Sequence, residues 1–521
     1  MSARGSAHDH ALHRLRALVD DLGAGGGAIT PAVYDTARTA ALLPHRPRTG
    51  EMLHWLTTRQ QPDGGWGDPL TPHARDLPTL AAVLALTPHP AHRPATEGGI
   101  AFLHRHAAQV WNGPVPQDIP VGLELLLPPL LAEARTAYPT LPTAPYDALR
   151  VLGKRRRQLI AQGAPHAAGT AAVHSWEGWG RATPPLPLDG SGGVGHSPAA
   201  TATALHHLER QAPAAHHLGR QAPADTLRTY LARATANRPP LLPTVWPIDV
   251  FERTWALHAL ALAGLLDHPH LATSCARQLD VLQAAYTPAG LGMSEHFVPD
   301  GDITATASLT LALAGRPSDP AVVERFRHDD HYRTYPGELQ PSLTTTAHAL
   351  HARTHADPAG PTGPAHRFLR ERQDADGRWS GDKWHTSWIY TTAQVMFALP
   401  AGTAARRGAE ALLGAQRPDG GWGAHHRATA GETGYAVLAL LTHRTPGTAP
   451  TLARAAHWLA RWQESGGVCD CHLWTGKETY CPQRIDRVVA HAAFLAAARS
   501  PRTRPAVPTP TDPAREATFR R

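Results

Sequence analysis

Hydrophobic residues recur along most of this chain with the spacing of an α-helix. In the segments 80–86 (L-A-A-V-L-A-L) and 436–441 (A-V-L-A-L-L), apolar side chains return at intervals of three and four. Proline and glycine turns interrupt such segments roughly every 15 to 20 residues. Alternating patterns typical of β-strands are scarce. The pattern predicts an all-α protein built from short helices.

Three segments repeat the pattern Gln-x-x-Asp-Gly-x-Trp. They are Q-Q-P-D-G-G-W-G (60–67), Q-D-A-D-G-R-W-S (373–380) and Q-R-P-D-G-G-W-G (416–423), and the last two lie 43 residues apart. That spacing is about the length of a helix pair. Asp-Gly favours a turn, while Gln and Trp can hydrogen-bond and pack between neighbouring helix pairs. The repeat predicts stacked helix pairs that close into an α/α barrel.

The composition indicates a soluble and mildly basic protein. Lys and Arg number 50 against 43 Asp and Glu, which gives a net charge of +7, and the basic residues are scattered. A phosphorylated small molecule fits this charge, and we expect no nucleic-acid partner. No apolar run reaches the roughly 18 residues of a membrane span, so we expect a cytoplasmic location. Residues 501–521 are expected to form a disordered tail. The sequence does not indicate an oligomeric state.

Two carboxylates stand one residue apart in P-D-G-D-I-T-A-T-A (299–307), just before an apolar segment. Such a pair can bind a metal, cap a helix or hold a proton away from water. In the structural interpretation, Asp300 caps a helix that starts at Ile303. In the chemical one, burial and the neighbouring charge keep a carboxyl group protonated near neutral pH. The residues alone leave these interpretations open.

Eight further segments, taken in chain order, resemble one family. They are I-T-P-A-V-Y-D-T-A (29–37), P-V-G-L-E-L-L-L-P (120–128), H-S-W-E-G-W-G (174–180), D-G-S-G-G-V-G-H-S-P-A-A-T-A (189–202), W-P-I-D-V-F-E-R-T-W (246–255), D-K-W-H-T-S-W-I-Y-T-T-A (382–393), E-T-G-Y-A-V-L-A-L (432–440) and L-W-T-G-K-E-T-Y-C-P (473–482). Together with the acidic pair they resemble the bacterial class II terpene cyclases, which make bicyclic diphosphates such as copalyl, labdadienyl or drimenyl diphosphate. The resemblance implies two α/α-barrel domains, with a γ domain at 45–249 inserted into a β domain at 1–44 and 250–500.

The resemblance also implies how the acidic pair acts. The family carries Asp-x-Asp-Asp, whose middle residue protonates the distal alkene of a linear prenyl diphosphate while the diphosphate is retained. Asp302 holds that middle position, and Asp300 orients and shares the proton. Ile303 replaces the third Asp, which puts acid tuning and reprotonation in question. Thr346 stands where the family pattern has Asn, so the terminating base is unassigned, with His348 or water as alternatives.

The diphosphate end of the site follows from the same resemblance. Glu177 matches a family glutamate associated with Mg²⁺, so magnesium is the expected cofactor. Lys383 and Lys477 are the expected diphosphate-binding cations, although either can instead be an ordinary surface lysine. The basic run 154–157 (K-R-R-R) is expected to be a solvated helix face.

Aromatic side chains are expected to line the carbocation pocket, because their faces stabilise positive charge without capturing it. Those in matched segments are Trp176, Trp179, Trp384, Trp388 and Tyr390. The bulk of Trp388 is expected to shorten the pocket, which favours farnesyl diphosphate as substrate and drimenyl diphosphate as product. The alternatives are geranylgeranyl diphosphate with a copalyl- or labdadienyl-type product, a squalene-hopene type cyclase, and a non-catalytic barrel.

Overall fold

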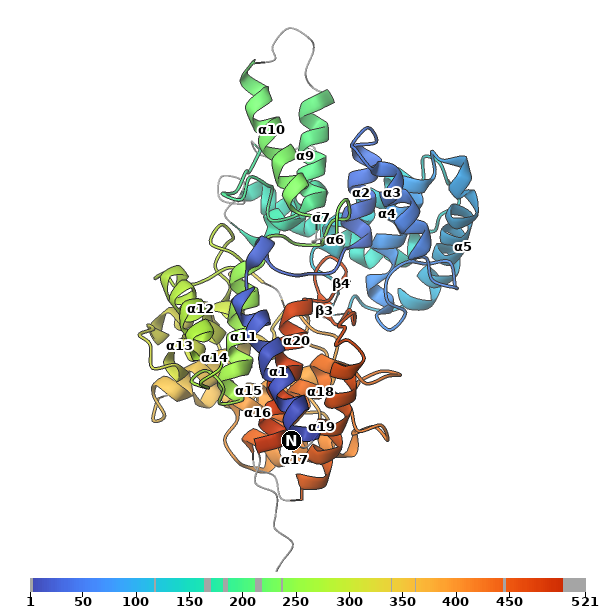
Figure 1. Ribbon diagram of the computed structural model, residues 1–521. Coiled ribbons are helices and arrows are strands. Elements are labelled where there is room, and N and C mark those ends of the chain that lie inside the picture. The colour runs from blue at the N-terminus through green and yellow to red at the C-terminus, as the bar shows by residue number, and fades with distance from the viewer. Residues whose placement is uncertain are drawn as a thin grey trace, which may run out of the picture.

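The computed structural model describes residues 3–116, 119–163, 170–180, 186–210, 218–235, 238–338, 340–360, 362–443 and 447–499. The predicted tail at 501–521 lies outside the described residues. Two helical domains are stacked along the long axis of the molecule (Figure 1). Each has its own hydrophobic core.

The lower domain in Figure 1 is an α/α barrel. Its helices are α1 (Ala3–Asp20), α11 (Asp249–Leu262), α12 (Ala272–Ala285), α13 (Gly301–Leu313), α14 (Leu343–Ala356), α15 (Gly363–Glu371), α16 (Trp388–Ala398), α17 (Thr403–Gly414), α18 (Ala430–Thr442), α19 (Ala449–Glu464) and α20 (Gln483–Arg499). Helices α11, α13, α14, α16, α18 and α20 each contact the next and close into a ring, while the others pack outside. The ring helices α11, α13, α16 and α18 are the most apolar of this domain, as expected for a layer that is covered on both sides.

The upper domain is a smaller helical layer of the same kind. It contains α2 (Val33–Leu42), α3 (Thr49–Thr58), α4 (Asp76–Leu86), α5 (Arg93–Val110), α6 (Leu123–Ala134), α7 (Asp147–Gln162), the 3-10 helix η5 (Ala171–Gly178), α9 (Pro198–Arg210) and α10 (Leu218–Arg233). Here α2, α4, α6, η5 and α9 form the inner ring.

The Gln/Trp repeat joins successive helix pairs in the way that the sequence predicts. In the second copy, the side-chain amide of Gln373 donates to the carbonyls of Gly377 and Ala404, both at 2.9 Å, and the Trp379 indole donates to Leu369 at 2.7 Å. The other copies make the same bonds, through Gln60 and Trp66 and through Gln416 and Trp422. Each repeat therefore ties a turn to the start of the next outer helix.

The chain passes from one core to the other earlier than the family analogy predicts. Ile29 belongs to the lower core, whereas Tyr34 and Ala37 of α2 are buried in the upper core. The change falls near residue 30, and not at residue 44, because α2 packs on α4 and α9. The return lies at residues 245–246, close to the predicted boundary at 249.

A short hairpin joins the two domains. Strands β3 (Trp474–Thr475) and β4 (Thr479–Tyr480) pair antiparallel and lie at the domain junction in Figure 1. Glu478 lies in the turn of this hairpin. Its carboxylate accepts hydrogen bonds from the backbone N–H groups of Val33 and Tyr34, at 2.7 and 2.8 Å. The hairpin therefore caps α2 of the upper domain with a side chain from the lower one. The remaining strands, β1 (Arg327–His328) and β2 (His331–Tyr332), pair only with each other.

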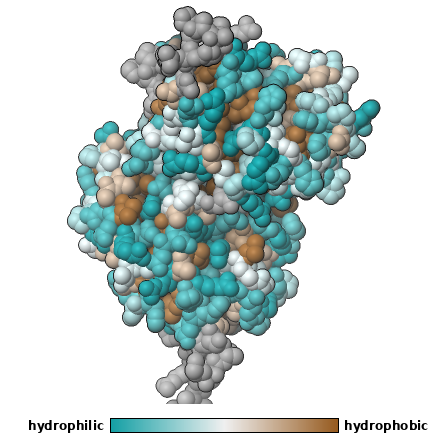
Figure 2. Space-filling model, turned by 45° about the horizontal axis from the view of Figure 1, so that its top comes forward, coloured by the Kyte–Doolittle hydropathy of each residue, from teal (hydrophilic) through white to brown (hydrophobic). Residues whose placement is uncertain are grey.

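On the face shown in Figure 2, hydrophobic residues form small patches separated by hydrophilic ones. Among the described residues, no helix combines the length and the apolar character needed to cross a membrane.

Candidate active site

Asp300 caps helix α13 and faces a cavity at the same time. One carboxylate oxygen accepts hydrogen bonds from the backbone N–H groups of Asp302, at 2.8 Å, and Ile303, at 3.0 Å. The side chain also interacts with the Tyr335 hydroxyl. Burial raises the pKa of Asp300 to about 8, and the nearby charge of Asp302 acts in the same direction. The cap and the perturbed acid are therefore one residue, and the two interpretations of the sequence coexist.

Asp302 is held by a histidine that comes from the next helix of the ring. His348 Nδ1 on α14 lies 2.6 Å from Asp302 Oδ1, and its Nε2 lies 2.9 Å from Gln394 Oε1. Burial alone would lower the pKa of His348, but the charge of Asp302 and its hydrogen bond raise it. Both ring nitrogens are engaged, so His348 is a partner of the acid and is poorly placed to act as a separate terminating base.

A second buried carboxylate fixes the helix that carries His348. Asp382 accepts hydrogen bonds from the Ser342 hydroxyl and the Leu343 backbone N–H, both at 2.9 Å, at the start of α14. Its other oxygen accepts from the Trp384 backbone N–H at 3.0 Å. Asp382 therefore sets the positions of both His348 and Trp384, although it lies outside the cavity.

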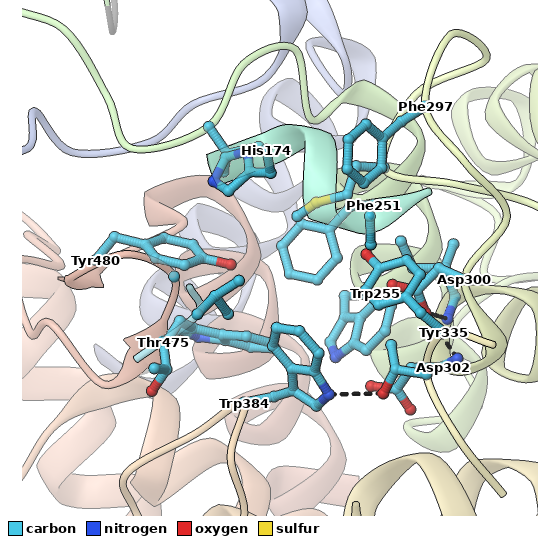
Figure 3. Close-up of a pocket in the computed structure, with 18 residues that line it drawn as sticks. His174, Phe251, Trp255, Phe297, Asp300, Asp302, Tyr335, Trp384, Thr475 and Tyr480 are labelled. Carbon is cyan, nitrogen blue, oxygen red and sulfur yellow. Dashed lines mark hydrogen bonds between the residues drawn. The ribbon is translucent and has the colours of Figure 1, made fainter. Parts of the chain in front are cut away.

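The cavity beside the acids lies between the two domains. Figure 3 shows Asp300, Asp302 and Tyr335 at one end and His174 and Tyr480 at the other. The lining residues are Val121, Ala171, His174, Val245, Phe251, Trp255, Met293, Phe297, Asp300, Asp302, Ile303, Thr334, Tyr335, Trp384, Trp474, Thr475, Gly476 and Tyr480. The wall is predominantly apolar and aromatic, and the two carboxyl groups are its only acids in the described part of the chain.

Ile303 forms part of this wall. It is buried in the lower core and also lines the cavity next to Asp302. The position at which the family has a third carboxylate therefore carries an apolar surface here. Its side chain offers Asp302 no hydrogen bond and no charge.

Of the five aromatic residues expected in the pocket, Trp384 alone lines it. Trp176 and Trp179 are buried in the upper core. Trp388, at the start of α16, packs beside the lower core with the Arg378 guanidinium 4.2 Å from its ring centre. The expectation that Trp388 shortens the pocket is therefore wrong, because its ring is engaged outside the cavity.

Tyr390 does not line the pocket but packs against two residues that do. Its hydroxyl oxygen accepts a hydrogen bond from the Trp255 indole at 3.0 Å, and its ring contacts Trp474. Trp255 and Phe251 line the cavity from α11, where their spacing of four residues puts them on one helical face. Both occur in the matched segment 246–255, and that spacing was the signal that could have identified them.

Glu177 and Lys477 meet in a closed cluster at the domain junction. Lys477 Nζ lies 2.6 Å from Glu177 Oε1 and 2.5 Å from Ser197 Oγ, and the Tyr34 hydroxyl donates to Glu177 at 3.1 Å. The Lys477 side chain is fully buried. The structure thus brings together two of the predicted diphosphate-end residues, but neither lines the acid pocket.

Lys383 lies elsewhere, in a groove that adjoins the pocket. Its Nζ is 2.6 Å from Glu338, and Arg156 of α7 lines the same groove. The expectation of a solvated face at 154–157 holds for Lys154 and Arg155, which are exposed. It is wrong for Arg156, because the helical turn directs this residue into the groove.

The residues present fit a magnesium ion only in part. Oε2 of Glu177 and Oδ2 of Asp35 are buried and have no hydrogen-bond partner within the described residues. In that same part of the chain, no group of three or more His, Cys, Asp or Glu side chains is arranged to hold a metal. Mg²⁺ commonly takes one or two carboxylates and completes its shell with phosphate oxygens and water. Glu177 fits such a role as a single protein ligand.

Comparisons with known proteins agree with this architecture. The chain is 41% identical over 509 residues to a (+)-kolavenyl diphosphate synthase from Herpetosiphon aurantiacus, covering 92% of this chain and 96% of that protein. It is 34% identical to a labda-7,13-dienyl diphosphate synthase from Streptomyces clavuligerus, covering 94% and 92%. The structure of an ent-copalyl diphosphate synthase from Streptomyces platensis matches with a TM-score of 0.74 and 29% identity, covering 95% and 100%. Residues 343–483 match the family model of the squalene-hopene cyclase C-terminal domain.

The chain therefore belongs to the bacterial class II terpene cyclases. It is an enzyme of the isomerase type with the two-domain helical architecture of that family. The family model of the squalene-hopene cyclases covers only part of the lower domain, whereas the diphosphate synthases match along nearly the whole chain.

Proposed function

We propose that this enzyme cyclises geranylgeranyl diphosphate to a bicyclic diphosphate of the copalyl, labdadienyl or kolavenyl type. The names of its relatives support this C20 substrate over farnesyl diphosphate. The main sequence argument for farnesyl diphosphate also loses its basis, because Trp388 lies outside the pocket.

The observation that carries the proposal is a buried carboxyl group on the wall of an aromatic cavity. Asp302 donates its proton to the distal alkene, and the resulting carboxylate is stabilised by the protonated His348 ring at 2.6 Å. Asp300, with a pKa of about 8, holds a second proton beside it at neutral pH. The proton held by Asp300 lies next to Asp302 and can be shared with it before an alkene reaches the pair.

The remaining residues guide the cation. The faces of Trp255, Trp384 and Trp474 stabilise positive charge as two rings close, and the apolar wall excludes water that would capture the cation. A proton is then lost while the diphosphate stays on the molecule. Bound Mg²⁺, with Glu177 as its proposed protein ligand, supplies positive charge that neutralises the diphosphate.

The proposal is tested by incubating the purified enzyme with Mg²⁺ and either geranylgeranyl or farnesyl diphosphate. The products are dephosphorylated and identified by mass spectrometry. We expect a bicyclic C20 alcohol. A bicyclic C15 alcohol alone would overturn the substrate, and unchanged geranylgeraniol and farnesol would overturn the catalytic proposal.

A further inference from the structure

A chain of three hydrogen-bonded side chains joins the two domains beside the pocket. His196 Nδ1 lies 3.0 Å from Asp189 Oδ2, and His196 Nε2 lies 2.6 Å from Ser294 Oγ. Asp189 and His196 belong to the segment before α9 of the upper domain, whereas Ser294 belongs to the segment before α13 of the lower one. His196 is fully buried and Ser294 is buried. The link between them therefore crosses the domain junction inside the protein.

The hydrogen atoms of this chain can be assigned from its two ends. Burial alone would raise the pKa of Asp189, but its hydrogen bonds from His196 and Ser191 lower it below the ordinary value. An ionised carboxylate only accepts hydrogen bonds, so His196 Nδ1 carries a proton and donates it to Asp189. Ser294 Oγ already accepts from the backbone N–H of His296 at 3.1 Å. The Ser294 hydroxyl hydrogen therefore points to His196 Nε2.

The order Asp–His–Ser is that of a catalytic triad, but this chain has no access to a substrate. Neither His196 nor Ser294 lines the acid pocket or the adjoining groove. A nucleophile needs a reacting atom within about 3 Å. The chain therefore acts through the residues that it holds in place.

The Ser294 end of the chain carries part of the pocket wall. Met293 and Phe297, on either side of Ser294 in the sequence, both line the pocket. The Met293 carbonyl accepts hydrogen bonds from the backbone N–H groups of Val250 and Phe251, at 3.1 and 3.2 Å. Phe251 is itself a wall residue. The position of Ser294 thus affects three side chains that face the cavity.

The His196 end of the chain holds a further part of the wall. The Phe297 ring packs against the His196 ring, with 4.9 Å between the ring centres. The carbonyl of Gly195 lies 2.8 Å from His174 Nδ1. Burial and the nearby charge of Lys477 lower the pKa of His174 to about 3, so its neutral ring donates Nδ1–H to this carbonyl. Figure 3 shows His174 and Phe297 on the same wall of the pocket.

The backbone of His196 is closely determined by its surroundings. Its φ of 56° lies in the left-handed region, which residues with a Cβ atom rarely adopt. Its N–H donates to Asp189 Oδ2 at 3.1 Å, and its carbonyl accepts from the Trp246 N–H at 2.9 Å. Such a conformation persists only where neighbouring groups hold it. The segment around His196 is therefore a firm support for Ser294.

We propose that His196 is a positioning residue that determines product specificity by holding the pocket wall through Ser294 and Gly195. The inference rests on the proposed function, since it concerns the carbocation formed in that reaction. With the link intact, Met293, Phe297 and His174 enclose the cation and exclude water. Without it, water adds to the cation and loses a proton, which gives a hydroxylated bicyclic diphosphate.

The test compares Ser294→Ala and His196→Asn with wild type. Ser294→Ala removes the donor to His196 Nε2. Asn tolerates the left-handed backbone, but its shorter side chain cannot reach both Asp189 and Ser294. We measure kcat with geranylgeranyl diphosphate and identify the dephosphorylated products by mass spectrometry. Both variants should raise the ratio of hydroxylated and isomeric C20 alcohols to the main product by about 10-fold, which is the discrimination that one contact in an apolar pocket typically supplies.

Tyr230→Phe is the matched control. It removes a buried hydrogen bond of 2.7 Å from the Tyr230 hydroxyl to the Trp246 carbonyl, in the same part of the molecule, and Tyr230 does not line the pocket. This variant should keep the product ratio of wild type. If all three variants lower the unfolding temperature and keep the wild-type product ratio, the role of His196 is purely structural and the inference is overturned. Ser294→Ala decides the question if His196→Asn does not fold.

Failure of the proposed function is recognised independently. If the wild-type enzyme cyclises neither prenyl diphosphate, hydrogen exchange at the Val250 and Phe251 amides, which donate to Met293, still tests the link. Exchange about 5- to 10-fold faster in Ser294→Ala and His196→Asn, but not in Tyr230→Phe, would support the positioning without the reaction. Equal exchange in all four proteins would overturn it.

Discussion

Two buried pairs, each of a carboxyl group and a basic side chain, have the same contact distance but occupy different surroundings. His348 Nδ1 lies 2.6 Å from Asp302 Oδ1, and Lys477 Nζ lies 2.6 Å from Glu177 Oε1. Asp302 lines the cavity, whereas the second pair lies buried at the domain junction and does not line it. The comparison teaches that one contact distance can serve two tasks. Beside the cavity it positions an acid, and at the junction it joins the two domains.

The largest effect should come from removing the acid. Asp302→Asn keeps the size of the side chain but leaves no acidic proton, so we expect kcat to fall about 100- to 10,000-fold. Asp329→Asn, in the exposed turn between β1 and β2, is the control for loss of one acidic charge. Cyclisation assays with circular dichroism measure activity and folding together. Retained activity in Asp302→Asn would show that another group donates the proton.

Removing Lys477, the cation of the second pair, should lower the stability of the fold. Lys477→Met leaves Glu177 buried without its partner, and we expect the free energy of unfolding to fall by about 3–5 kcal/mol. Urea unfolding measures this change, and the double variant Lys477→Met/Glu177→Gln should recover part of it. A raised KM at unchanged stability would instead support the prediction that Lys477 binds the diphosphate.

The titration of Asp300 should also make the stability of the fold depend on pH. The pKa of Asp300 is raised to about 8 in the folded protein, against an ordinary value of 3.8. Between these values the folded state holds a proton that the unfolded state has released. Unfolding free energy therefore falls as pH rises from about 4 to 8, with a slope approaching about 1.4 kcal/mol per pH unit.

Asp300→Asn removes this titration and keeps a good helix cap, because Asn caps as well as Asp. We expect a flatter stability profile between pH 4 and 8 than in wild type, measured by urea unfolding at each pH. Parallel profiles for the two proteins would mean that Asp300 is not protonated in the folded state.

The smallest effects should distinguish two tryptophans from the same matched segment. Trp384→Ala widens the pocket and removes an aromatic face from its wall, so we expect kcat/KM to fall about 2- to 30-fold. Trp388→Ala should leave the chain length of the accepted substrate unchanged. A gain of longer substrates in Trp388→Ala would restore it as a determinant of pocket length.

The fold could be predicted from the sequence because its signals are local and repeated. Helical spacing and three Gln/Trp segments predict a barrel of helix pairs, and each copy makes the predicted bonds. The acid pair was identifiable because a single residue separates Asp300 from Asp302 and an apolar helix follows. The sequence suggests His348 only as an alternative base, since nothing in it indicates that α14 brings this residue to Asp302.

The aromatic wall could not be predicted in the same way. A matched segment identifies which residues are present but not which face of a helix each occupies. Trp176 and Trp179 lie in the core for this reason, while Phe251 and Trp255 line the pocket. The prediction of a solvated face fails at Arg156 for a similar reason, because a run of four basic residues spans more than one face of a helix.

The hairpin that caps α2 has a consequence for the order in which the protein is made. The upper core is formed by one continuous stretch, from Val33 to Trp246, and can assemble as soon as that stretch has left the ribosome. The lower barrel cannot, because α1 packs against α20 and the ring closes between α11 and α20. Ribosomes stalled before residue 474 would therefore carry an assembled upper core without the Glu478 cap of α2, an open barrel and no completed active site.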